Sequence, residues 1–129
     1  MTTSISLATR CWLVVAAVCF SSALLSAHLK LMRSAPAADA VLESSPDVLQ
    51  LWFSEEPLLP LSGVTLTGPG GPIKLEPLRA GGERSLVAKV GATLEPGAYR
   101  VEWKAAGDDG HVIGGTVPFA IKPKHPPAK

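Results

Sequence analysis

The chain has 129 residues and carries 12 Lys and Arg against 11 Asp and Glu, for a formal net charge of +1. It therefore has neither the basic excess typical of a nucleic-acid-binding protein nor an acidic run for a cationic partner. Cys11 and Cys19 both lie close to the N-terminus, so the remainder of the chain has no disulfide and no thiolate metal site. A domain of about 100 residues without these supports depends on its apolar core, which is feasible at this size.

Residues 1–27 have the pattern of a secretory signal peptide. Arg10 precedes an apolar run that ends in small residues, and this order is typical of a cleaved leader. The charge-free run is also at the short limit for spanning a bilayer, so an uncleaved anchor is the alternative. Cleavage after Ala27 would leave His28 first, whereas cleavage after Ala23 fits the small-residue rule better. The processing rule by itself leaves both positions open.

In the first half of the exported chain, the strongest pattern is a strand over 48–53. Leu49, Leu51 and Phe53 alternate onto one face of it. Trp52 then lies on the other face, and we interpret it as packing across neighbouring strands. Weaker patterns predict strands over 28–33, 63–67, 73–75 and 85–90, with loops over 37–45 and 78–84.

The second half contains the clearest strand, 98–104, and a closing strand over 115–121. Seven short strands, turn signals about every ten residues and no helical periodicity predict an all-β fold. We expect an antiparallel Greek-key β-sandwich of the immunoglobulin-like type. Its core is expected to contain Leu49, Leu51, Phe53, Tyr99, Val101, Trp103 and Phe119.

The segment 105–113, expected to be a loop or an edge, contains the most suggestive chemical pattern, Asp109-Gly110-His111. Side chains two apart in an extended segment point to the same side, so Asp109 and His111 can converge. Asp108 would point to the opposite side. A carboxylate and an imidazole form a plausible half of a metal site, although this spacing is also common among ordinary surface residues.

Four phrases, in order, resemble the CopC-like family of periplasmic copper-binding proteins. Residues 28–36 are similar to the family's H-x-x-L-x-x-S-x-P start, and 49–55 to its L-x-L-x-F-S-E strand. Residues 97–103 are similar to G-x-Y-x-V-x-W, and 109–119 to D-x-H-x-x-x-G-x-x-x-F. Each phrase is weak alone, but their order and spacing make the resemblance specific over 28–121.

The resemblance implies that cleavage after Ala27 exposes His28, and that His28, Asp109 and His111 are metal ligands. In that family the α-amine and imidazole of the first histidine bind Cu(II) together, and a later Asp and His complete the site. Three nitrogens and one oxygen suit the tetragonal preference of Cu(II). Four protein ligands leave little room for a substrate, which favours a carrier over an enzyme.

The expected function is therefore a periplasmic, non-enzymatic Cu(II) carrier or buffer in copper homeostasis or resistance. We expect a monomer that exchanges copper with an inner-membrane copper transport protein and binds no nucleic acid. The expected divisions are a signal peptide over 1–27, a copper-binding β-sandwich over 28–121 and a disordered Pro/Lys tail over 122–129. His125 in that tail is expected to be solvated rather than a ligand.

Two other functions fit parts of the pattern less well. Polysaccharide monooxygenases also chelate copper with an N-terminal histidine, but this chain is small and has few aromatic residues for a sugar-binding face. A metal-free interaction module would not depend on a free N-terminus.

Some members of the resembled family hold Cu(I) in a methionine-rich loop. Met32 is the only methionine of the exported part, so such a site is not expected.

Overall fold

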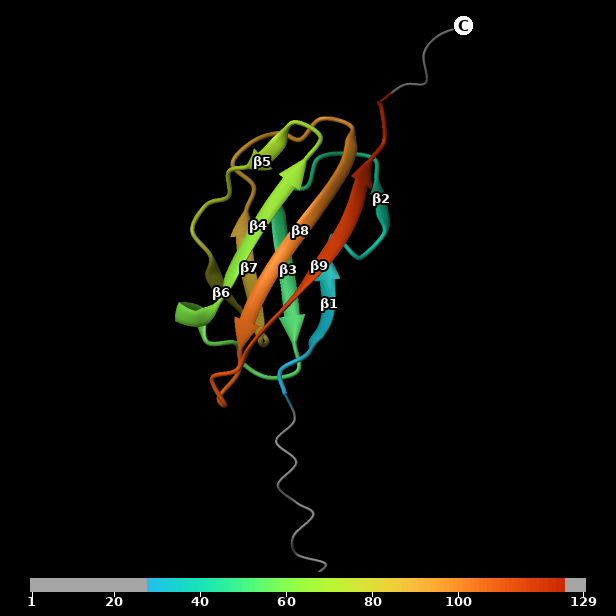
Figure 1. The fold of residues 1–129 in the computed structure, drawn as a ribbon. Helices are drawn as coiled ribbons and strands as arrows, with labels where there is room; N and C mark the ends of the chain where they lie inside the picture. Colours follow the sequence, from blue (N-terminus) through green and yellow to red (C-terminus); the bar gives the residue numbers. More distant parts are fainter. Residues whose placement is uncertain (1–27, 125–129) are drawn as a thin grey trace, which may run out of the picture.

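The computed structural model describes residues 28–124, which form two facing β-sheets (Figure 1). The predicted signal peptide and residues 125–129 of the predicted tail, with His125, lie outside the described residues. The strands are β1 (Leu31–Ala35), β2 (Ala40–Leu42), β3 (Val48–Phe53), β4 (Gly63–Gly68), β5 (Gly71–Ile73), β6 (Arg79–Gly82), β7 (Ser85–Lys89), β8 (Gly97–Ala106) and β9 (Val112–Ile121). A short 3-10 helix, η2 (Leu59–Leu61), precedes β4.

The order of the strands confirms the predicted β-sandwich. One sheet has the order β1-β3-β7-β6, and the other has the order β2-β9-β8-β4-β5. All pairings between these strands are antiparallel except that of β2 with β9, which is parallel. Within 28–124, no helix is long and apolar enough to cross a membrane.

Two local expectations were wrong. The segments 37–45 and 78–84, expected to be loops, contain β2 and β6, so there are more strands than the seven expected. Neither has a clear alternating pattern, and all four residues of β6 are exposed. Their strand character comes from pairing with β9 and β7, which a local pattern does not reveal. The segment 105–113, expected to be a loop or an edge, is a turn over 107–111, because β8 continues to Ala106 and β9 begins at Val112.

The core lies between the sheets and contains all seven predicted residues. Phe53 and Trp103 meet edge to face with their ring centres 5.4 Å apart. Tyr99 and Phe119 stack at 5.3 Å. Edge-to-face and offset-stacked pairs at these distances stabilise a core beyond their buried area. Trp52 faces outward as predicted, and the Arg33 guanidinium from the neighbouring strand lies 3.8 Å from its ring centre.

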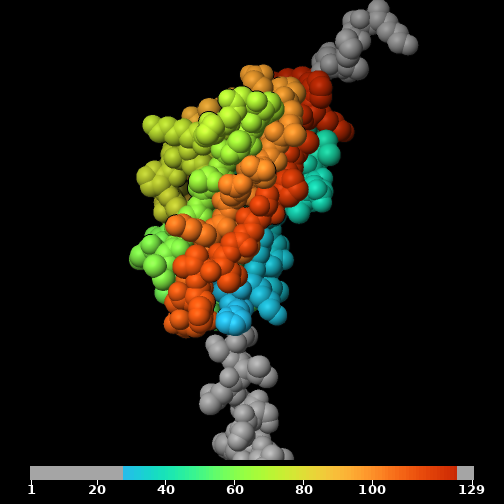
Figure 2. All heavy atoms as spheres, viewed as in Figure 1, coloured from blue at the N-terminus to red at the C-terminus, as the bar shows by residue number. Residues whose placement is uncertain are grey.

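Three chain segments meet at one end of the sandwich. Leu31 of β1 pairs with Phe53 at the end of β3, so His28 lies just beyond this edge. β8 and β9 are paired over their whole length and are joined at the same end by the turn over 107–111. The blue start of the described chain and the orange turn therefore lie together at the lower end of Figure 1, and Figure 2 shows them in contact.

Candidate metal centre

The position of His28 is set by the residues that follow it. Leu29 is 2 % exposed and belongs to the core, so it anchors the start of the described chain. The backbone of Lys30 makes two hydrogen bonds with Ser54, one to the backbone and one to the side chain. Alternation along an extended chain then turns His28 away from the core, and its side chain is 66 % exposed.

The position of Asp109 and His111 is set by the tight turn between β8 and β9. The Gly110 N–H donates to the Gly107 carbonyl at 2.9 Å. Gly110 has a φ of +73°, a conformation that glycine adopts without a steric penalty. The Glu55 carboxylate lies against the backbone of Gly107, where a Cβ would collide with it. The contact between Glu55 and this turn was not predicted, and the F-S-E phrase is the only signal in the sequence that pointed to this region.

The structure brings the three predicted ligand residues together. The Nδ1 atoms of His28 and His111 lie 3.1 Å and 3.3 Å from Oδ2 of Asp109. The two imidazole rings are 5.7 Å apart and nearly perpendicular. One possible ligand atom from each of the three residues lies within 4.8 Å of the other two. Among the described residues, this is the one group of three or more His, Cys, Asp or Glu with such spacing, and Asp108 is not part of it.

These distances fit a metal ion with little rearrangement. Two ligand atoms that bind at right angles and about 2.0–2.1 Å from a metal ion are about 2.9 Å apart. The two observed N–O separations exceed this value by only a few tenths of an ångström. Two imidazoles and a carboxylate are the donors that divalent copper, nickel and zinc accept, and the absence of thiolates disfavours a soft-metal site.

Asp109 is held as an anion at the centre of the cluster. A hydrogen bond from the backbone N–H of His111, 3.1 Å from Oδ1, is the largest cause that lowers the pKa of this carboxyl. Hydrogen bonds from the side chains of His111 and His28 lower its pKa further. A depressed folded-state pKa means that this group contributes to stability at neutral pH and loses that contribution as the pH falls through the folded pKa. The carboxylate is therefore ionised and available to a cation near neutrality.

We expect the Asp109 carboxyl carbon to titrate, by NMR of the metal-free protein, at a lower pH than an aspartate in an unstructured peptide. His111→Ala should move this midpoint only part of the way up, because the backbone N–H of residue 111 remains a donor. A midpoint at or above the peptide value would contradict the hydrogen-bonded arrangement.

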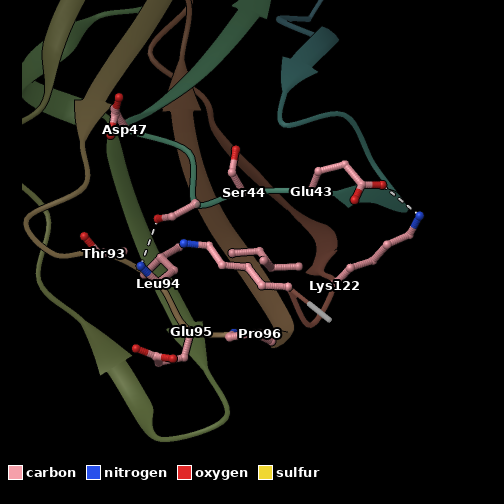
Figure 3. Close-up of a pocket in the computed structure, with 11 residues that line it drawn as sticks. Glu43, Ser44, Asp47, Thr93, Leu94, Glu95, Pro96 and Lys122 are labelled. Atoms are coloured by element: carbon pink, nitrogen blue, oxygen red, sulfur yellow. Dashed lines mark hydrogen bonds and ion pairs between the residues drawn. The ribbon is translucent and has the colours of Figure 1, made fainter. Parts of the chain in front are cut away.

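The end of the sandwich opposite the candidate metal centre contains a cavity. It has a volume of about 460 Å³ and lies between the loops that precede β3 and β8 and the end of β9 (Figure 3). On its rim, Lys122 forms an ion pair with Glu43 at 2.8 Å, and the Ser45 hydroxyl accepts a hydrogen bond from the N–H of Leu94. None of the three candidate ligands lines this cavity. The candidate metal centre is thus separate from this cavity, and its three residues are exposed.

The fold and the cluster together define a class: a small β-sandwich with a candidate metal centre of imidazole and carboxylate groups at one end. Residues 31–122 match the family described as the CopC domain, and the chain belongs to this family. The match covers the whole sandwich from β1 to just beyond β9.

Named relatives agree with this family. The chain is 31 % identical to copper resistance protein C of Xanthomonas campestris pv. juglandis over 125 residues, which cover 91 % of this chain and 96 % of the relative. It is 33 % identical to the protein YobA of Escherichia coli K12, with 74 % and 80 % covered. Among solved structures, PcoC of Escherichia coli, described as a methionine-rich copper resistance protein, matches with a TM-score of 0.68 and 34 % identity. That match covers 74 % of this chain and 100 % of PcoC.

Proposed function

We propose that this protein is an exported Cu(II) carrier or buffer in copper homeostasis or resistance. The chain belongs to a family of copper resistance proteins and is not an enzyme. The observation that carries the more specific proposal is the convergence of His28, Asp109 and His111 at one end of the sandwich. The relatives named for copper resistance support copper as the ion that this cluster binds.

The proposed ligands are the α-amine and ring of His28, the ring of His111 and a carboxylate oxygen of Asp109. When the amine and Nδ1 of an N-terminal histidine bind the same ion, they close a six-membered chelate ring. The position of His28 Nδ1, 3.1 Å from Asp109 Oδ2, is compatible with this mode. An α-amine has an ordinary pKa of about 7.7–8, so Cu(II) displaces at most one proton from it near neutral pH.

This proposal requires that the signal peptide is removed after Ala27. We propose that the processed protein acts in the periplasm as a monomer and exchanges copper with an inner-membrane copper transport protein. The exposure of both imidazoles, 66 % and 75 %, supports exchange, because a partner's ligands can reach the ion without local unfolding. A cluster exposed to this degree suits transfer better than long-term storage.

We propose Cu(II) rather than Cu(I) because the donors are nitrogen and oxygen. Cu(I) is selected by thiolate and thioether ligands. Met32 is the single methionine among the described residues, and it lies on β1 with an exposed side chain, four residues beyond His28. This differs from PcoC, which is described as methionine-rich.

The ligand set is tested by two substitutions in the processed protein. His111→Ala should weaken Cu(II) binding more than Asp109→Ala, because it removes a nitrogen donor, whereas water can replace one carboxylate oxygen. Competition titration against a Cu(II) chelator measures both affinities. His125→Ala and Asp108→Ala are the matched controls and should leave the affinity unchanged. Equal affinity in wild type and His111→Ala would rule out this site.

A further inference from the structure

The final rung of the β1–β3 ladder is unusual because it uses a side chain. The Ser54 N–H donates to the Lys30 carbonyl at 2.9 Å, as a ladder bond would. The returning bond, however, runs from the Lys30 N–H to the hydroxyl Oγ of Ser54, also at 2.9 Å. A residue at position 54 without a side-chain acceptor would leave only one of these two hydrogen bonds, and the Lys30 N–H would lose its acceptor.

The backbone carbonyl of Ser54 has a different partner. Arg84 Nη1 donates to it at 3.1 Å, and the Arg84 carbonyl accepts a hydrogen bond from the Phe53 N–H at 2.9 Å. Arg84 lies in the turn between β6 and β7 and has a φ of +60°. The carbonyl of Ser54 is therefore bonded to the β6–β7 turn. On the side that faces β1, the Ser54 hydroxyl accepts the hydrogen bond that a backbone carbonyl would otherwise accept.

We propose that Ser54 is a positioning residue for the metal centre, whose hydroxyl holds the N-terminal segment so that His28 faces Asp109. Lys30 is two residues from His28, and its rung is the last backbone connection to β3 before the histidine. The burial of Leu29 attaches the N-terminal segment to the core. The hydrogen bond from Lys30 to Ser54 determines the direction in which this segment runs along the edge of the sheet. Part of this proposal rests on the proposed function, because its effect on copper requires His28 to be a ligand.

The test compares wild type with Ser54→Ala, Ser54→Thr and the control Ser34→Ala, each exported as a full-length chain and purified after processing. Ser34 lies on β1, the strand that Ser54 holds, but its hydroxyl donates to the nearby carbonyl of Pro36. In the metal-free proteins, amide hydrogen exchange at Lys30 measures the hydrogen bond to Ser54. The NMR contact between the His28 and His111 rings measures whether His28 still faces the cluster. Titration with Cu(II) alone reports its consequence.

In Ser54→Ala we expect faster exchange at Lys30, a weaker ring contact and a Cu(II) affinity lower by roughly three- to tenfold, the range for losing one hydrogen bond. Ser54→Thr should restore all three, and Ser34→Ala should change none. Unchanged Lys30 exchange and ring contact in Ser54→Ala would overturn the proposal, and so would an altered ring contact with unchanged Cu(II) affinity. If wild type itself fails to bind Cu(II) through His28, the proposed function fails, while the metal-free measurements still decide the role of Ser54.

Discussion

A processed protein with one additional residue in front of His28 is expected to lose most of its affinity for Cu(II). The imidazole would survive the extension, but the α-amine would become an amide nitrogen, which is a poor donor unless it is deprotonated. The chelate would then be reduced to a single ring nitrogen at this residue. Because a linked second donor contributes an effective concentration that is worth 10²–10⁴ in binding, we expect a loss on the order of 100-fold or more.

This loss should exceed that of His111→Ala and of Asp109→Ala, in that order. A Cu(II)-chelator competition titration compares the three proteins under one set of conditions. The matched control carries the same added residue after Lys129, where it is far along the chain from the cluster. An extended protein that binds Cu(II) as tightly as the protein beginning at His28 would contradict both the proposed ligands and the proposed cleavage after Ala27.

Trp103→Ala is expected to destabilise the fold by about 3–5 kcal/mol, the range for deleting a large core aromatic. Trp103 is 9 % exposed, meets the ring of Phe53 edge to face and lies against Gly115, where a Cβ would be 2.9–3.0 Å from the indole. A small domain has a total stability of about 5–15 kcal/mol, so this single change removes a large part of it. Urea unfolding at equilibrium measures the difference.

The loss should come from packing rather than from hydrogen bonding. Within the described part of the chain, the buried Nε1 of Trp103 has no hydrogen-bond partner, so its removal breaks no such bond. Trp103→Phe should therefore cost clearly less than Trp103→Ala. Trp52→Ala is the surface control, because Trp52 lies on the outer face with Arg33 over its ring and should cost about 1 kcal/mol or less. Unchanged stability of Trp103→Ala would contradict the assigned strand faces.

The strands that bury one face could be predicted from the sequence because their signal is local. In β3 and β8, apolar residues recur at every second position, and this period alone assigned Leu51, Tyr99 and Val101 to the core. β2 and β6 carry no such period. Their existence depends on pairing partners distant in sequence, such as the parallel pairing of Ala40 with Phe119, which no local pattern encodes.

The candidate metal centre also has one part that the sequence predicted and one part that depends on the tertiary structure. The two-residue spacing of Asp109 and His111 predicted that they converge, so the sequence by itself determined this half of the cluster. The prediction assumed an extended segment, whereas the structure holds the two residues on a tight turn in which Gly110 has a φ of +73°. The distance between His28 and Asp109, 81 residues apart, was decided only by the tertiary structure, because it depends on β1 lying at the edge of β3 beside the β8–β9 turn. The family resemblance named His28 as a candidate ligand, but the burial of Leu29 and the hydroxyl of Ser54 supply the physical reason that it faces the cluster.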